Sequence, residues 1–212
     1  FVETIDAVEK SGLAGPIRSN DGQDLMLGGF GKDNMRGGAD NDILVGQAGD
    51  DRLTGNRGDD ILVGGEGDDL AFGGGGNDII AGNDGNDYVN GHDGNDWLFG
   101  GAGDDRLYGA HGEDLIFGMD GNDTLFGNRD DDQLVGGAGN DGAFGGGGDD
   151  QIFGGDGDDV LVGNDNQDCI EGGDGNDLIF GDNNNGVAVV GPASDKINAG
   201  DGDDTVYGGE DD

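Results

Sequence analysis

The sequence predicts an all-β chain wound as a right-handed solenoid, with two parallel sheets and about ten coils of two nine-residue units each. Three observations lead to this prediction. From Ser19 to Tyr207 the chain divides without a gap into 21 units of nine residues. Position 8 of the unit is apolar in all 21 units, and position 6 is Asp in 20 of them. Glycine accounts for 53 of 212 residues, whereas it makes up about 7% of average proteins.

Composition excludes several classes of protein. Asp and Glu number 48 against 9 Lys and Arg, so the formal net charge is −39. A direct nucleic-acid partner is excluded, because binding it requires a basic face. No apolar run approaches the roughly 18 residues of a membrane span. The single Cys169 excludes an intrachain disulfide framework. The remaining choices are a disordered acidic chain or one that binds many cations, and the regular repeat favours the second.

Residues 1–18 lie outside the repeat and are predicted to form a cap or a linker. Phe1, Ile5 and Val8 fit one face of a short helix. Residues 208–212 have the sequence that opens another unit, so we expect the chain to be a segment of a longer protein. We recognise no signal peptide in it.

Each unit between residues 19 and 207 is predicted to form a turn followed by a short strand. The unit from Gly154 to Val162, GGDGDDVLV, is an example. Positions 7 to 9 form the strand, and only position 8 points inward, because side chains alternate between the two faces of a strand. The glycine-rich first six residues form the turn, since glycine adopts φ > 0 readily. Two units make one coil, so odd units stack in one sheet and even units in the other.

The position-6 aspartates of every second unit are predicted to stack above one another. Stacked carboxylates repel, and one apolar side chain per unit is too little burial to offset the entropy of ordering nine residues. A cation bound between successive turns would turn the repulsion between the carboxylates into attraction and so favour the folded chain. The available ligands are all oxygens, which suits Ca²⁺, whereas Zn²⁺ prefers Cys or His. Pairing each unit with the unit two further along allows up to about 19 Ca²⁺ sites. The predicted carboxylate ligands are Asp24, Asp33, Asp42, Asp51, Asp60, Asp69, Asp78, Asp87, Asp96, Asp105, Asp114, Asp123, Asp132, Asp141, Asp150, Asp159, Asp168, Asp177, Asp195 and Asp204.

The unit GGxGxDxUx, where U is apolar, resembles the nonapeptide of the RTX (repeats-in-toxin) family of secreted bacterial proteins. The resemblance covers 189 of 212 residues. It implies a parallel β-roll in which Ca²⁺ is held by the position-6 Asp of two stacked turns and by main-chain carbonyls. One turn offers the carbonyls of positions 2 and 4, and its partner those of positions 1 and 3. For a middle site these turn residues are Gly64, Gly65, Glu66 and Gly67, with Gly82, Asn83, Asp84 and Gly85 in the partner turn. The family also implies type I secretion of an unfolded chain that folds outside the cell.

The pattern is irregular at a few positions. Between residues 181 and 198, position 6 is Gly186 in one unit and Pro192 lies in the next. This stretch is either a degenerate coil or a nine-residue loop that bulges out and reverses the odd and even order beyond it, and we expect no normal calcium sites there. The position-4 glycine is replaced in five units, once by Ala193, which is less suited to the turn, and otherwise by Asp or Asn, which both tolerate the left-handed conformation. The Asp and Asn replacements are Asp40, Asp130, Asn166 and Asn184.

No catalytic motif is found, and we predict that the segment is not an enzyme. His92 and His111 are the only histidines and are expected to face solvent in turns. The first interpretation is a calcium-folded structural or docking segment of a secreted or surface bacterial protein. One alternative is the C-terminal export and folding module of an RTX protease, lipase or toxin whose catalytic domain is absent here. Another is a subunit that packs against a larger assembly.

The odd units are apolar at both outward positions, 7 and 9, over six coils. These residues, which we call the odd face, are Leu25, Leu27, Ile43, Val45, Ile61, Val63, Ile79, Ala81, Trp97, Phe99, Leu115 and Phe117. β-Propensity should favour such residues equally in both sheets, yet the even units are mixed. Soluble monomers rarely expose a continuous apolar strip of this size. We therefore predict that the odd face from Leu25 to Phe117 is covered by another domain, a second copy or a protein partner.

Overall fold

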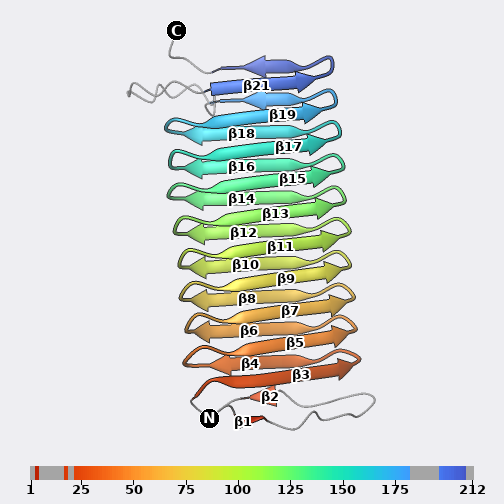
Figure 1. Ribbon diagram of the computed structural model, residues 1–212, viewed down its shortest axis with the longest axis vertical. Coiled ribbons are helices and arrows are strands. Elements are labelled where there is room, and N and C mark those ends of the chain that lie inside the picture. Colours follow the sequence, from red (N-terminus) through yellow and green to blue (C-terminus); the bar gives the residue numbers. More distant parts are fainter. Residues whose placement is uncertain (1–2, 5–16, 19–21, 182–195, 209–212) are drawn as a thin grey trace.

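The computed structural model describes residues 3–4, 17–18, 22–181 and 196–208. Within these residues the chain contains strands and no helix, and it winds into a β-solenoid of about nine turns (Figure 1). It follows that the described part has no helix capable of spanning a membrane.

Two sheets of eleven strands each form the walls of the solenoid. The odd sheet contains β1 (Glu3–Thr4), β3 (Asp24–Phe30), β5 (Ile43–Ala48), β7 (Ile61–Glu66), β9 (Ile79–Asp84), β11 (Trp97–Ala102), β13 (Leu115–Asp120), β15 (Gln133–Ala138), β17 (Gln151–Asp156), β19 (Cys169–Asp174) and β21 (Lys196–Asp201). The even sheet contains β2 (Ile17–Arg18), β4 (Asn34–Gly38), β6 (Arg52–Arg57), β8 (Leu70–Gly75), β10 (Tyr88–Asp93), β12 (Arg106–His111), β14 (Thr124–Arg129), β16 (Gly142–Gly147), β18 (Val160–Asp165), β20 (Leu178–Phe180) and β22 (Thr205–Tyr207).

Neighbouring strands in each sheet are parallel and in register. Leu62 of β7 lies opposite Ile80 of β9, an offset of two units, and the same offset holds from β3 to β19 and from β4 to β20. The predicted two parallel sheets and the coil of two nine-residue units are therefore confirmed.

The strands are longer than predicted. Most run for six residues, from position 7 of one unit to position 3 of the next, as in β7, so the prediction that positions 1 to 3 belong to the turn was wrong. The turn after β7 is limited to Gly67, Asp68 and Asp69. The reason is that stacked coils keep hydrogen bonding beyond the apolar positions: Gly49 N–H donates to the carbonyl of Glu66 at 2.6 Å.

The core is a narrow column between the two sheets. Position 8 supplies its apolar part, from Met26 to Ile179, and these side chains are almost completely buried. The position-6 aspartates and the position-1 glycines are buried beside them. A β-carbon on Gly64 would overlap Asp69 Oδ2 and would lie 2.8 Å from the carbonyl oxygen of Gly82. Position 1 of this coil therefore has no room for a side chain.

Two short strands extend the sheets at the N-terminal end. Glu3 of β1 pairs with Asp24, and Ile17 of β2 pairs with Met35, the latter at the two-unit offset of the roll. The prediction of a helix was wrong for Glu3–Thr4, because the open edge of a parallel sheet offers hydrogen-bonding partners to an extended chain. Residues 5–12, where the rest of the helix was expected, lie outside the described residues.

The register changes once, near the C-terminal end. Ile170 of β19 lies opposite Ile197 of β21, and Ile179 of β20 lies opposite Val206 of β22, both at an offset of three units instead of two. Nine extra residues therefore leave the ladder between β20 and β21, and the odd and even order of the units reverses beyond them. Residues 182–195, which include Gly186, Pro192 and Asp195, lie outside the described residues.

A second hydrogen-bond ladder runs along the outside of the turns at position 5. The Asn41 side chain accepts from Asp59 N–H at 2.9 Å, Asp59 accepts from Asn77 N–H at 2.8 Å, and Asn77 accepts from Asn95 N–H at 2.9 Å. The sequence analysis missed this ladder. It explains why position 5 is Asn or Asp in most units although it faces solvent.

Candidate calcium-binding site

The position-6 aspartates form a continuous column along each edge of the roll. The main-chain N–H of Asp60 donates to Oδ1 of Asp78 at 2.7 Å, and the N–H of Asp78 donates in the same way to Asp96. One carboxylate oxygen of each aspartate therefore ties its turn to the preceding turn. Such bonds join eight stacked pairs on one edge, from Asp24 to Asp168, and nine on the other, from Asp33 to Asp204.

The second carboxylate oxygen is the candidate metal ligand. In Asp60, Asp78 and Asp96, as in most of the column, Oδ2 is buried and has no hydrogen-bond partner. Leaving a buried acceptor unsatisfied is costly, and more so when the group is charged. A bound Ca²⁺ ion would supply the missing partner and neutralise the charge, so the residues present fit this cation.

Burial changes the acidity of these carboxyls. Desolvation raises the pKa of Asp60 and Asp78 to about 7 and that of Asp132 to about 8. The main-chain hydrogen bond to each carboxylate opposes this shift, and repulsion from the aspartates one coil away adds to it. A cation-free roll near neutral pH therefore holds a mixture of charged and neutral carboxyls, whereas calcium binding requires the charged form.

Glycine and its substitutes shape the turns around the carboxylates. Gly65 at position 2 and Gly67 at position 4 have φ of +130° and +122°, a region that a β-carbon resists. At position 4, Asp40, Asp130 and Asn166 also adopt positive φ, between 71° and 83°. The prediction that Asp and Asn tolerate this conformation is confirmed for these three. Asn184 lies outside the described residues.

The RTX resemblance implied two sets of turn residues for a middle calcium site, and these two sets lie one coil apart. Gly65 is opposite Asn83 and Glu66 is opposite Asp84 in the ladder between β7 and β9. The position-3 carbonyls take part in that ladder, because Asp84 O accepts from Gly67 N–H at 2.8 Å. Among the described residues, no group of three or more His, Cys, Asp or Glu side chains converges on one point. A cation at these turns therefore needs main-chain oxygens as well as carboxylates.

The columns differ between their middle and their ends. Asp96 is fully buried, whereas Asp24 and Asp33 in the first coil are 9% and 8% exposed. Asp204 in the last coil is half-buried and accepts from Asp177 N–H at 3.0 Å, and Asp195 lies outside the described residues. The turns at the two ends therefore surround their carboxylates less completely with protein atoms than the central turns do.

The remaining candidate residues lie on the surface. His111 Nδ1 is 2.8 Å from Asp93 Oδ1, and both side chains are exposed. His92 is also exposed, and its ring stacks with that of Phe72 at 6.0 Å between centroids. The expectation that both histidines face solvent is confirmed, although they lie at strand ends. Cys169 is an exposed free thiol.

Comparison with known families matches this architecture. The family model for the RTX calcium-binding nonapeptide repeat, which spans four copies of the unit, matches residues 18–53, 36–71, 54–89, 72–107, 81–116, 108–143, 144–179 and 180–212. The chain belongs to the RTX family. A comparison with curated proteins finds no match. The RTX assignment agrees with the resemblance found in the sequence, and it identifies calcium as the cation that these repeats bind.

The calcium-free RTX roll is expected to be more stable at pH 5 than at pH 8. The pKa of buried carboxyls such as Asp60 and Asp78 lies near 7 in the roll, against an ordinary value of 3.8. The stability that these groups contribute is therefore fully present below about pH 4 and is lost as the pH rises through about 7. Circular dichroism in EGTA at both pH values measures it. Equal strand content at pH 5 and pH 8 would contradict this expectation.

Central and terminal aspartates are expected to respond differently to substitution. Asp96→Ala removes a ligand shared by two neighbouring turns, so the calcium midpoint for folding should rise about tenfold. Asp24→Ala should only fray the first coil. Asp96→Asn keeps the acceptor for Asp78 N–H but loses the charge, and it should resemble Asp96→Ala. Calcium titrations followed by circular dichroism compare the three variants, and equal midpoints for Asp96→Ala and Asp24→Ala would argue against the stacked-site interpretation.

Proposed function

We propose that this RTX segment is exported unfolded, folds on extracellular Ca²⁺, and serves as a structural or docking segment of a secreted or surface bacterial protein. The observation that carries the proposal is the pair of aspartate columns, in which a buried carboxylate oxygen in each central turn lacks a partner. A chain that needs a cation in every turn stays unfolded where calcium is scarce and folds where it is abundant.

The number of ions in this proposal follows from the stacked pairs. The described residues contain 17 hydrogen-bonded pairs of position-6 aspartates, eight on one edge and nine on the other. With one ion for each pair, the charge supplied offsets most of the −39 on the chain. This number lies slightly below the upper bound of about 19 obtained from the repeat count.

We further propose that the segment itself performs no catalysis, because its carboxylates belong to repeated turns. The same roll would also suit the C-terminal export and folding module of an RTX protease, lipase or toxin. The full-length gene separates the two roles, since a catalytic domain upstream favours the export module.

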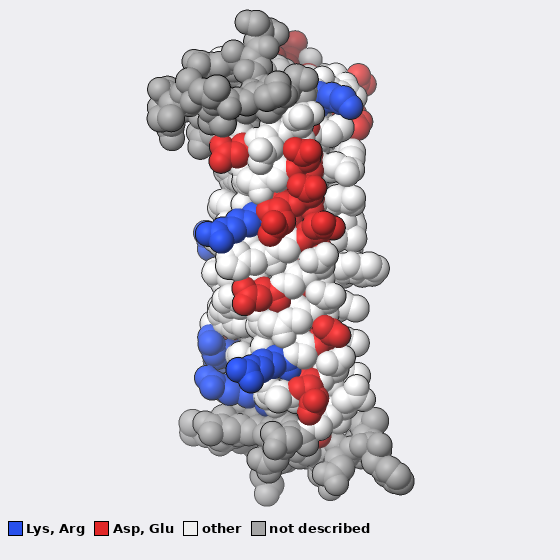
Figure 2. Space-filling view, turned by 90° about the vertical axis from the view of Figure 1, so that its left-hand side faces the viewer, with Lys and Arg blue, Asp and Glu red and all other residues white. Residues whose placement is uncertain are grey.

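The docking part of the proposal rests on the odd face. Ile43, Ile61, Ile79 and Trp97 point outward from β5, β7, β9 and β11 and are between 37% and 53% exposed. In contrast, all six arginines of the chain lie on strands of the even sheet. Figure 2, a view of one edge of the roll, shows the basic side chains in a few small groups, each beside acidic side chains. An uncharged apolar strip on so acidic a protein is best explained by a cover of another domain, a second copy or a partner.

Folding of the chain at pH 8 is expected to depend on calcium. Without Ca²⁺ the carboxylates of the columns are mostly ionised and repel one another, so the chain should be expanded. With millimolar Ca²⁺ it should be compact and rich in strand. Circular dichroism and size-exclusion chromatography measure both properties. A strand spectrum that persists at pH 8 in excess EGTA, after dialysis, would disprove the proposal.

Charges placed on the odd face are expected to abolish association without affecting folding. The variant is Ile61→Asp with Phe99→Asp, and the matched control on the even sheet is Leu70→Asp with Tyr108→Asp. Sedimentation of the isolated segment measures self-association, and hydrogen exchange of the full-length protein measures coverage by another domain. Both variants should fold with calcium, and only the first should lose association or protection. An odd face that is bare in the full-length protein, with a monomeric chain, would refute the docking role.

A further inference from the structure

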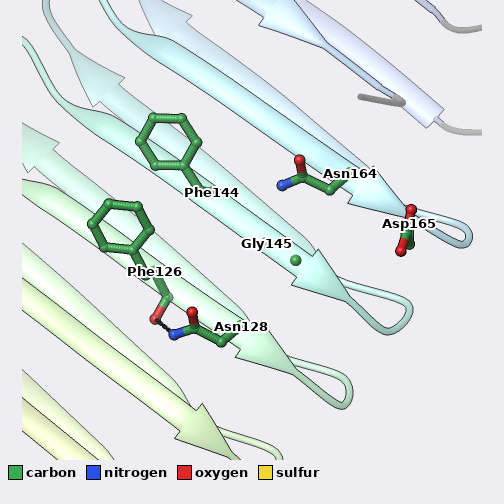
Figure 3. Close-up of a pocket in the computed structure, with 7 residues that line it drawn as sticks. Phe126, Asn128, Phe144, Gly145, Asn164 and Asp165 are labelled. Carbon is green, nitrogen blue, oxygen red and sulfur yellow. Dashed lines mark hydrogen bonds between the residues drawn. The ribbon is translucent and has the colours of Figure 1, made fainter. Parts of the chain in front are cut away.

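A shallow notch interrupts the outer surface of the even sheet at β16. Gly145 and Gly146 of β16 line its floor, where Gly146 carries no side chain. The notch has a volume of about 380 Å³. Its walls are two aromatic rings and three polar side chains, namely Phe126, Phe144, Asn128, Asn164 and Asp165 (Figure 3).

Two asparagine amides flank the floor. Asn128 of β14 and Asn164 of β18 both lie opposite Gly146 in the ladder, one on each side. Their Nδ2 groups donate to the main-chain carbonyls two residues earlier, at 3.3 Å and 3.5 Å. Each amide keeps its carbonyl oxygen and a second N–H for a ligand. The notch thus presents donors and acceptors that are held in place by the main chain.

The aromatic wall is fixed by its neighbours. The rings of Phe126 and Phe144 stack at 5.1 Å between centroids with an interplanar angle of 13°. Gly142, in the same strand as Phe144, leaves room for that ring, since a β-carbon there would lie 3.4 Å from Cε2. In Figure 3 the two amides lie on either side of Gly145 and extend toward the rings. An apolar wall and two oriented amides therefore face the same small space.

Four coils before the notch, β8 has a similar sequence, but other side chains cover its aromatic ring. Phe72 and the glycines of β8 correspond to Phe144 and those of β16, eight units further along the chain. There, the Arg52 guanidinium lies 4.5 Å from the centroid of the Phe72 ring, and the His92 ring stacks against it. Thr124 takes the position of Arg52 beside Phe144. The Phe144 ring therefore has the Phe126 ring beside it but, among the described residues, no guanidinium or imidazole of the kind that covers Phe72.

We propose that the β16 notch binds one hexose-type unit of a neutral saccharide. Sugar hydroxyls both donate and accept, which matches the amides of Asn128 and Asn164 and the carboxylate of Asp165. The C–H groups of a sugar ring are attracted to the negative face of an aromatic ring such as Phe144. Asp165 and the net charge of −39 repel anionic ligands, and the amides disfavour a wholly apolar ligand.

The test is a titration of the calcium-loaded chain with glucose, mannose, galactose and dextran. The side-chain amide signals of Asn128 and Asn164, followed by NMR in ¹⁵N-labelled protein, should shift and saturate with at least one of these probes. Phe144→Leu and Asn164→Gly should each weaken binding about fivefold or more, the equivalent of one lost contact. Glycine is chosen at position 164 because φ is +80° there, so its main chain should keep the same conformation.

Matched controls come from the odd sheet. Phe153→Leu alters the same position of the unit in β17, and Gln47→Gly removes a side-chain amide in β5 where φ is +84°. Both controls should leave binding unchanged, and circular dichroism should show all four variants folded with calcium. The proposal is overturned by the absence of a saturable shift with all four probes, by an equal loss in the controls, or by binding of anionic polygalacturonate in preference to dextran.

Discussion

The buried carboxylate at position 6 is the constraint on which the other features of this RTX roll depend. Its Oδ1 joins one turn to the next, as in the bond from Asp60 N–H to Asp78, while Oδ2 remains buried and unpaired. Position 1 is glycine throughout the regular coils because a β-carbon on Gly64 would overlap the carboxylate of Asp69, and Ala199 in the last described coil is an exception. With these two inward positions occupied, only position 8 remains for an apolar core. A core this thin buries little apolar surface, and this is why we propose that bound calcium contributes to the free energy of folding.

The sequence was sufficient to predict the period, the two sheets and the stacked aspartates, because all of them follow from residues that recur in nearly every unit. The strand length was predicted wrongly because glycines such as Gly64 and Gly65 were interpreted as turn residues. In a stack of identical coils, the main chain of each glycine finds the main chain of the next at the correct distance, and the ladder continues through them. The position-5 ladder was missed although its signal was present, since a short amide or carboxylate such as Asn77 was interpreted only as a solvated neighbour of the ligand.

The change of register near the C-terminal end shows which irregularities such a roll tolerates. Ile197 occupies the place opposite Ile170 although three units instead of two separate them, and Val206 does the same for Ile179. Nine extra residues move odd units into the even sheet and even units into the odd sheet, but Ile197 and Val206 stay in register with the apolar column, because the pattern repeats every nine residues. An insertion of four or five residues would place Ile197 at the wrong phase and direct polar side chains into the core. The length of the extra segment is therefore set by the same period as the coil.

The inward positions are the same in both sheets, so whatever distinguishes one RTX roll from another has to lie at the outward positions. The two sheets of this chain differ there. The odd sheet presents Ile61, Ile79 and Trp97, and the even sheet carries all five arginines whose side chains are described and the row of stacked rings that includes Tyr108 and Phe126. Neither set contributes to the aspartate columns, and β-propensity alone would not separate them. The turns and the core specify the fold and the calcium-binding turns, and the two outer faces carry the residues in which the two sheets differ.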